Sequence, residues 1–313
     1  MPSAPESRCA IGNATIGAMA DTVRSSVNAV VERRVMVAPG VELHVEVRLG
    51  DRAAAPFVLV HGLASNARLW DGVAEFLQAA GHTVVAIDQR GHGLSDAPDS
   101  GYDLDTAVAD LLTLIDMLEL ERPVLAGQSW GGNVVLELGW RRPDAVRGIA
   151  CVDGGVIELS QAFPSWEECL AALTPPALDH LTLAELETRI RKSVPHFTDR
   201  AVAAYLHCFR ARPDGTIEPR LQRPRHLLIL RSLWEHRPST RWATLKVPTM
   251  LLLADSGDGT RTSRKRSAEA VALAAGGKIR SVWFSPGHHD LHLEFPERVA
   301  ELFLQALREG FFA

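Results

Sequence analysis

Residues 123–140 read PVLAGQSWGGNVVLELGW and contain the pattern that decides the fold. The apolar segment Pro123–Ala126 predicts a buried strand, and Gly131–Trp140 predicts a helix. Between them, GQSWG (127–131) predicts a sharp strand-to-helix turn whose glycines prevent collisions. Such a turn exposes the Ser129 hydroxyl at the carboxyl edge of a sheet, where the Trp130 N–H can face a developing oxyanion. This stretch therefore predicts a nucleophilic serine.

The segments on either side of this stretch alternate between strand and helix patterns. Short apolar runs predict strands, and apolar residues spaced i, i+3, i+4, i+7 predict helices with one buried face. The predicted strands are 41–47, 57–60, 83–87, 148–152, 249–254 and 279–284; the predicted helices are 64–80, one beginning near Asp103 or Asp105, 182–193, 199–212 and one opening at Pro296. The first strand alternates and is expected to be half-buried and antiparallel. The alternation predicts a mostly parallel sheet with helices on both faces.

The alternation stops after Gly155. Residues 156–243 contain helical patterns but no convincing buried strand, and strand character returns at residue 249. We therefore expect one α/β body in two parts, 31–155 and 244–313, interrupted by a helical insertion at 156–243. Residues 1–30 are expected to form a mobile tail, part of which would precede a true start at Met19; a secretory signal is the alternative.

Composition and charge exclude several classes of protein. With 33 Lys and Arg against 38 Asp and Glu, the net charge of −5 offers no nucleic-acid-binding signature. The basic stretches 220–225 and 261–266 are interpreted as solvated faces. The four cysteines show no CxxC spacing and no apolar run is long enough to span a membrane, so we expect a reduced, cytoplasmic protein that binds neither nucleic acid nor membrane.

A serine hydroxyl needs a base before it can attack a carbonyl. Twelve histidines are available, and the segment GHHDLH (287–292) lies between the last predicted strand and the last predicted helix. A loop there can project an imidazole over the same sheet edge as Ser129. The segment matches no familiar metal-ligand spacing, so we expect no metal and no cofactor.

Together these motifs resemble the α/β-hydrolase superfamily, in the form with a helical cap inserted after the sixth strand. The resemblance rests on His61-Gly62, on DQRGHGLS (88–95), on the serine turn, and on HLEFP (292–296) near the end. It covers 31–155 and 244–313 well and the insertion only loosely. It implies an α/β-hydrolase fold with a mostly parallel central sheet flanked by helices.

The resemblance also assigns roles. It implies that His289 is the base, with His288 as the alternative and His292 structural, and that the Leu63 and Trp130 N–H groups form the oxyanion hole. For the acid it favours Asp258 after the strand 249–254, although Ala254 departs from the glycine usual there. Asp153, at the end of the sixth strand, and Asp255 are the alternatives. His61, Asp88 and Arg90 are expected to brace loops.

These features predict a serine hydrolase that cleaves a small carboxylic ester, lactone or thioester through an acyl-enzyme. The alternatives are a carbon–carbon bond hydrolase acting on a diketone, or a small-molecule receptor that retains the triad. Epoxide hydrolysis and dehalogenation are disfavoured, because the family members that carry them out have Asp in place of Ser129. Aromatic residues of the insertion suggest an apolar substrate pocket: Trp166, Phe197, Tyr205, Trp234 and Trp242. The oligomeric state cannot be read from the sequence.

Overall fold

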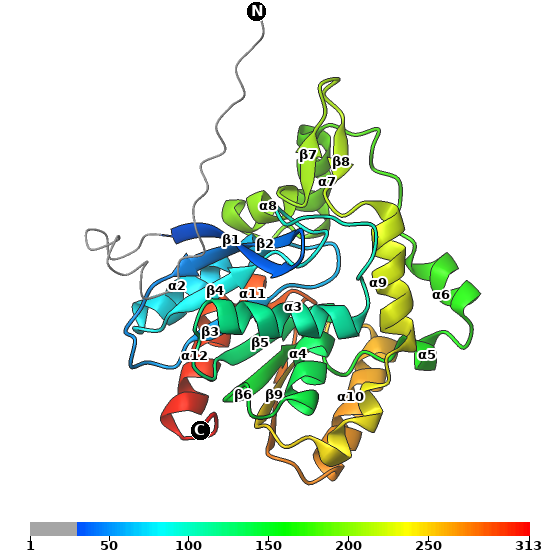
Figure 1. The fold of residues 1–313 in the computed structure, drawn as a ribbon. Coiled ribbons are helices and arrows are strands. Elements are labelled where there is room, and N and C mark those ends of the chain that lie inside the picture. Colours follow the sequence, from blue (N-terminus) through cyan, green and yellow to red (C-terminus); the bar gives the residue numbers. More distant parts are fainter. Residues whose placement is uncertain (1–29) are drawn as a thin grey trace, which may run out of the picture.

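A computed structural model describes residues 30–313, which are built around one eight-stranded sheet (Figure 1). The strand order is β1-β2-β4-β3-β5-β6-β9-β10. The strands of this sheet are β1 (Val30–Ala38), β2 (Val41–Arg48), β3 (Phe57–Val60), β4 (Val84–Ile87), β5 (Val124–Gln128), β6 (Gly148–Val152), β9 (Thr249–Ala254) and β10 (Ile279–Phe284). All neighbours from β4 to β10 pair in parallel, whereas β2 pairs antiparallel with both β1 and β4. The predicted mostly parallel sheet is confirmed.

The β1–β2 hairpin differs from the sequence prediction in two ways. β1 was not predicted, although Val35 and Val37 are buried while their neighbours Arg34 and Met36 are exposed. β2 is not half-buried, because β1 and β4 flank it and its residues from Leu43 to Arg48 are all buried. Its polar side chains reach buried partners, such as Arg48 with Asp71, which is why an alternating pattern does not face water here.

Helices cover both faces of the sheet (Figure 1). On one face, α2 (Asp71–Ala79) and α12 (Pro296–Arg308) bury Leu77 and Phe303 against strand residues. On the other face lie α3 (Leu104–Met117), α4 (Trp130–Arg141) and α10 (Gly259–Ala274). The predicted helix starts hold: Asp103 caps α3, its side chain accepting from the Thr106 N–H at 2.8 Å, and Pro296 opens α12. Within 64–80 the structure has a 3₁₀ turn, η1 (Ala67–Trp70), before α2.

Between β6 and β9 the chain leaves the sheet. This segment contains α5 (Leu159–Ala162), α6 (Trp166–Leu173), α7 (Leu183–Ser193), α8 (Asp199–Leu206), α9 (Arg223–Glu235) and the 3₁₀ turns η2 (Pro238–Thr240) and η3 (Trp242–Thr244). It also contains a small hairpin, β7 (Phe209–Ala211) and β8 (Ile217–Pro219). The predicted helix 199–212 is therefore too long.

The hairpin has a local cause. Gly215 adopts a positive φ of 86° and the Asp214 side chain accepts from the Thr216 N–H at 2.9 Å, which reverses the chain tightly. The sequence Pro213-Asp214-Gly215 thus lies in the turn of a hairpin inside the inserted segment.

Two predictions fall wholly or partly outside the described residues. The mobile tail was predicted for residues 1–30, and the signal peptide and the start at Met19 belong to the same segment. Only Val30 of this segment is described, and it is the first residue of β1. Within residues 30–313, no helix is long and apolar enough to cross a membrane. Of the four cysteines, Cys151, Cys169 and Cys208 are buried free thiols.

Candidate active site

The turn between β5 and α4 exposes a single side chain. Ser129 has φ 53° and ψ −120°, a left-handed backbone conformation that a non-glycine residue rarely adopts. Every residue from Pro123 to Gly139 is buried except Ser129, which is partly exposed. The predicted strand–turn–helix context is confirmed, and the strained turn holds the hydroxyl at the carboxyl end of β5 beside the N-terminus of α4.

Glycines on neighbouring loops make room for this turn. A Cβ on Gly154 would lie 2.9 Å from the Ser129 nitrogen, and one on Gly62 would lie 3.0 Å from the Ser129 Cβ. The Ser129 N–H donates to the Val152 carbonyl at 2.9 Å. The loop after β6 and the loop after β3 therefore both touch the turn, which fixes three strand ends around one serine.

The loop after β3 is held by two histidines. The Nε2 of His61 accepts from the Gln89 N–H at 3.0 Å, and the Nε2 of His92 accepts from the Ala64 N–H at 3.2 Å. Burial lowers the pKa of both imidazoles, that of His92 to about 3, so both remain neutral acceptors. His61 thus shapes this turn, as expected, and Leu63 lies between the two anchored positions.

His289, the base predicted from the sequence, contacts the carboxylate of Asp153 at the end of β6. His289 Nδ1 lies 2.6 Å from Asp153 Oδ2. The Asp153 side chain is fully buried, whereas 47% of the His289 side chain is exposed. Because this contact uses Nδ1, the opposite ring nitrogen, Nε2, remains available to another partner. This is the geometry of a carboxylate that fixes the tautomer of a catalytic histidine.

Asp258, the aspartate that the resemblance favours as the acid, has other partners than His289 in the structure. Asp258 caps α10: its Oδ1 accepts from the N–H groups of Thr260 and Arg261 at 3.0 and 3.2 Å, and its side chain is 46% exposed. Asp255 is likewise occupied, accepting from the Thr262 hydroxyl at 2.8 Å. Asp153, the first alternative, is the carboxylate that contacts His289.

The Asp153–His289 contact shifts both pKa values toward the charged forms. Burial favours the neutral acid, but the hydrogen bond from His289, with the charges of His289 and Lys265, lowers the pKa of Asp153. For His289, desolvation opposes the charge, but the hydrogen bond and charge of Asp153 and the charge of Asp290 raise the pKa. Asp153 is therefore an anion suited to stabilise an imidazolium.

A second buried carboxylate ties the histidine loop to two other regions. Asp290 Oδ1 accepts from Gln128 Nε2 at 3.1 Å, and Gln128 also donates to the His289 carbonyl at 3.3 Å. Asp290 Oδ2 accepts from the hydroxyl of Tyr205, which comes from α8. Because Gln128 directly precedes Ser129, these bonds hold the serine turn and the histidine loop at the same edge of the sheet.

The other two histidines of the 287–292 segment differ from His289. His288 Nδ1 lies 3.4 Å from Asp290 Oδ2, and its backbone N–H donates to Glu294. His292 is fully buried against Trp70, with ring centroids 4.4 Å apart. Neither contacts Asp153, so the structure separates the three imidazoles by environment, which their spacing alone does not do.

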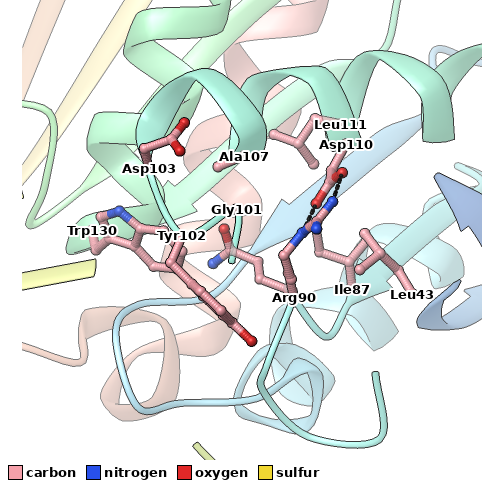
Figure 2. A pocket seen from close by; sticks show the side chains of 11 residues that line it. Leu43, Ile87, Arg90, Gly101, Tyr102, Asp103, Ala107, Asp110, Leu111 and Trp130 are labelled. Carbon is pink, nitrogen blue, oxygen red and sulfur yellow. Dashed lines mark hydrogen bonds and ion pairs between the residues drawn. The ribbon is translucent and has the colours of Figure 1, made fainter. Parts of the chain in front are cut away.

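The DQRGHGLS segment braces the fold as expected. Asp88 is buried and accepts from His44 Nδ1 at 2.9 Å and from the N–H groups of Ala67 and Leu94 at 2.8 Å. Arg90 makes a bidentate pair with Asp110 of α3 at 2.7 and 2.9 Å (Figure 2). Figure 2 shows this pair among the side chains that line a small pocket, of which Trp130 is another. Ser129, Asp153 and His289 do not line it, and Trp130 is the candidate site residue that does.

The aromatic residues of the inserted segment do not converge on one place. Trp166 and Trp234 flank the Arg231 guanidinium, which lies 5.0 and 4.9 Å from their ring centroids, and Trp242 is buried in the core. Phe197 and Tyr205 stack at 5.9 Å, and Phe197 lies 5.4 Å from the His288 ring. Of the five, these two are therefore nearest the histidine loop.

Among residues 30–313, no group of three or more His, Cys, Asp or Glu side chains is arranged to hold a metal ion.

Comparison with known proteins gives a consistent result. A profile of the alpha/beta hydrolase family matches residues 57–302. A non-heme chloroperoxidase of Streptomyces lividans is 42% identical over 86 residues, covering 28% of this chain and 31% of that protein. A 2-(acetamidomethylene)succinate hydrolase of Mesorhizobium japonicum is 29% identical over 158 residues, covering 50% of this chain and 49% of that protein. The chain thus spans about a third to a half of the length of these relatives.

The crystal structure of E-2-(acetamidomethylene)succinate hydrolase superposes with a TM-score of 0.72 at 20% identity, covering 90% of this chain and all of that one. At this identity the likeness concerns the fold alone.

Proposed function

The chain belongs to the alpha/beta hydrolase family, and on that premise we propose that it is a serine hydrolase that cleaves a small-molecule substrate through an acyl-enzyme on Ser129. One observation carries the proposal. Ser129 is the one residue of the buried stretch 123–139 that reaches the surface, and it does so from a strained turn at the sheet edge where His289 and Asp153 pair. A turn that had only to connect β5 and α4 would not need a non-glycine residue at φ 53°.

The proposed chemistry uses these groups in turn. His289 Nε2 takes the Ser129 proton as the hydroxyl attacks the substrate carbonyl, and Asp153 stabilises the imidazolium. The Leu63 and Trp130 N–H groups bind the oxyanion. The imidazolium then protonates the leaving group, which departs and leaves the acyl group on Ser129. Water, deprotonated by the same imidazole, releases the acid and restores the serine.

We assign the segment between β6 and β9, residues 156–243, as a cap over this edge, and a small carboxylic ester, lactone or thioester as the substrate class. The support for the cap is that α8 reaches the histidine loop through the Tyr205–Asp290 hydrogen bond. Phe197 and Tyr205 add an apolar wall there, which suits an apolar acyl or alcohol group.

Covalent labelling tests the nucleophile. A fluorophosphonate probe should label the wild-type protein at Ser129, and Ser129→Ala should abolish labelling. Ser267→Ala removes an exposed serine on α10 and serves as the matched control, which should label like the wild type. A folded wild type that is not labelled would overturn the proposal.

Turnover separates the remaining possibilities. We expect hydrolysis of p-nitrophenyl esters or of lactones, with activity changing with acyl length. Cleavage of a diketone without ester hydrolysis would instead assign carbon–carbon bond hydrolysis. Labelling without turnover of any member of the panel would favour a receptor that retains the triad.

A further inference from the structure

Lys265 of α10 reaches into the candidate site. Its Nζ lies 2.7 Å from both carboxylate oxygens of Asp153 and donates to the Ala254 carbonyl at 2.7 Å. The lysine side chain is 21% exposed, so the contact is largely shielded from solvent. Asp153 Oδ1 also accepts from the Ala254 N–H at 2.9 Å. The buried carboxylate therefore accepts from three donors, of which only His289 is needed for the proposed chemistry.

Lys265 differs from the other cations of its stretch. The sequence 261–266 reads RTSRKR and had been interpreted as a solvated face. Arg261 pairs with Asp258 at 3.2 Å, and Arg266 lies over the Trp283 ring at 4.3 Å. Arg264 is exposed and makes no ion pair with any residue in the range 30–313. Within this stretch the contact with Asp153 belongs to Lys265 alone.

The charges around His289 explain what a cation does there. Asp153 faces the imidazole from β6 and Asp290 follows it in the loop, so two carboxylates favour the imidazolium. Lys265 opposes it from α10, and His292, on α11 (Leu291–Glu294), is neutral because burial lowers its pKa to about 4. Tyr205 and Gln128 complete the surroundings as uncharged donors to Asp290. His288 also faces Asp290, with its Nδ1 3.4 Å from Asp290 Oδ2. Among residues 30–313, Lys265 is thus the lysine or arginine that contacts Asp153 and offsets the two carboxylates.

We propose that Lys265 is a positioning residue that orients the Asp153 carboxylate toward His289 and limits protonation of the imidazole, so that more of it is available as a base. A general base works best when its pKa lies near the working pH. Without a nearby cation, Asp153 and Asp290 would raise the pKa of His289 further, and a smaller fraction of the imidazole would be neutral at a given pH. This inference rests on the proposed Ser129–His289–Asp153 mechanism.

The pH dependence of fluorophosphonate labelling tests it without a known substrate, because attack by Ser129 needs neutral His289. The second-order rate constant would be measured from pH 5 to pH 9 for the wild type, Lys265→Met, Lys265→Gln and Lys265→Arg. Loss of the positive charge should move the midpoint of the acid limb upward by about one pH unit. Lys265→Arg should restore the wild-type midpoint, which a purely structural contact would not require.

Arg264→Met is the matched control, because it removes an exposed positive charge from the same helix. Its midpoint should equal that of the wild type. An unchanged or lowered midpoint in Lys265→Met and Lys265→Gln would overturn the inference. If Lys265→Met does not fold, Lys265→Gln, which keeps a hydrogen-bond donor, decides alone. A wild type that does not label would instead contradict the proposed function itself.

Discussion

The loops that follow β6 and β9 each place an aspartate at the carboxyl end of a central strand, and they use it differently. Asp153 is fully buried and bonded to His289, Lys265 and the Ala254 N–H. Asp258 is 46% exposed and caps a helix. Neighbouring parallel strands end at the same edge of the sheet, so both aspartates lie at that edge. Burial and hydrogen-bond partners, and not strand position, therefore distinguish a candidate catalytic aspartate from a structural one.

The largest expected effect separates the two aspartates by activity. Asp153→Asn should lower kcat/KM by about 10³–10⁴, the loss typical when a triad carboxylate no longer fixes the histidine tautomer. Asp258→Asn is the matched change on the neighbouring loop and should leave kcat/KM within about twofold, since Asp258 does not contact His289. Ester hydrolysis at pH 8 measures both. Equal losses in the two variants would erase the distinction between the loops.

The pH profile sharpens the same comparison. Wild-type activity should fall about tenfold per pH unit below the pKa of His289, because the base is protonated there. Since Asp153 raises that pKa, the fall should begin above the pH expected for an ordinary histidine. Asp153→Asn should move the acid limb to lower pH, and Asp258→Asn should not move it. An acid limb that responds to Asp258 instead would reverse the assignment.

The raised pKa of His289 also has a consequence for stability. The pair of Asp153 with the imidazolium should stabilise the fold fully below about pH 6.5, the ordinary pKa of histidine, and lose that contribution as the pH rises through the His289 pKa. Urea unfolding across pH 5 to 9 measures it. Asp153→Asn should weaken this dependence and leave the part that is due to Asp290, with the Asp258→Asn curve following the wild type.

A smaller effect on activity and stability is expected from the Tyr205–Asp290 hydrogen bond, which lies in the histidine loop next to His289. Tyr205→Phe removes one donor to the buried Asp290 and should cost about 1–2 kcal/mol of stability. Because Asp290 is held with the His289 backbone by Gln128, kcat/KM should fall by up to about tenfold. Tyr102→Phe is a suitable control, since its hydroxyl bonds a carbonyl away from the site. No change in either quantity would show that α8 does not help to hold the loop.

The smallest effect is on the exposed aspartate. Asp258→Ala should lower the free energy of unfolding by about 1 kcal/mol through loss of the α10 cap, with activity retained. Urea unfolding together with ester hydrolysis measures both quantities. Loss of activity without loss of stability would show that Asp258 has a chemical role.

The sequence predicted the sheet, the serine turn and the base-bearing loop well, because each depends on local patterns. The bounds of β6, β9 and β10 coincide with the predicted runs, and Ser129 has the predicted strand–turn–helix context. The hairpin strand β1 was missed although its alternation was visible at Val35 and Val37. Asp214 and Gly215 lie in the turn that joins β7 to β8, a hairpin that the helical patterns of the inserted segment did not predict.

The choice among the three aspartates and the inward position of Lys265 could not be predicted in the same way. Asp153, Asp255 and Asp258 all follow buried strands, and only the folded chain brings one of them to His289, 136 residues away. Lys265 lies among three arginines, and nothing in that stretch indicates which cation turns inward. Long-range side-chain pairing is the part of the site that the local pattern does not encode.

The central claim is that Asp153, and not Asp258, holds the proton of His289 Nδ1. Proton NMR observes that hydrogen directly as a resonance far downfield of the amide region, assigned by its loss in His289→Gln. We predict that the resonance persists in Asp258→Asn and disappears in Asp153→Asn. A resonance lost in Asp258→Asn and kept in Asp153→Asn would contradict the claim.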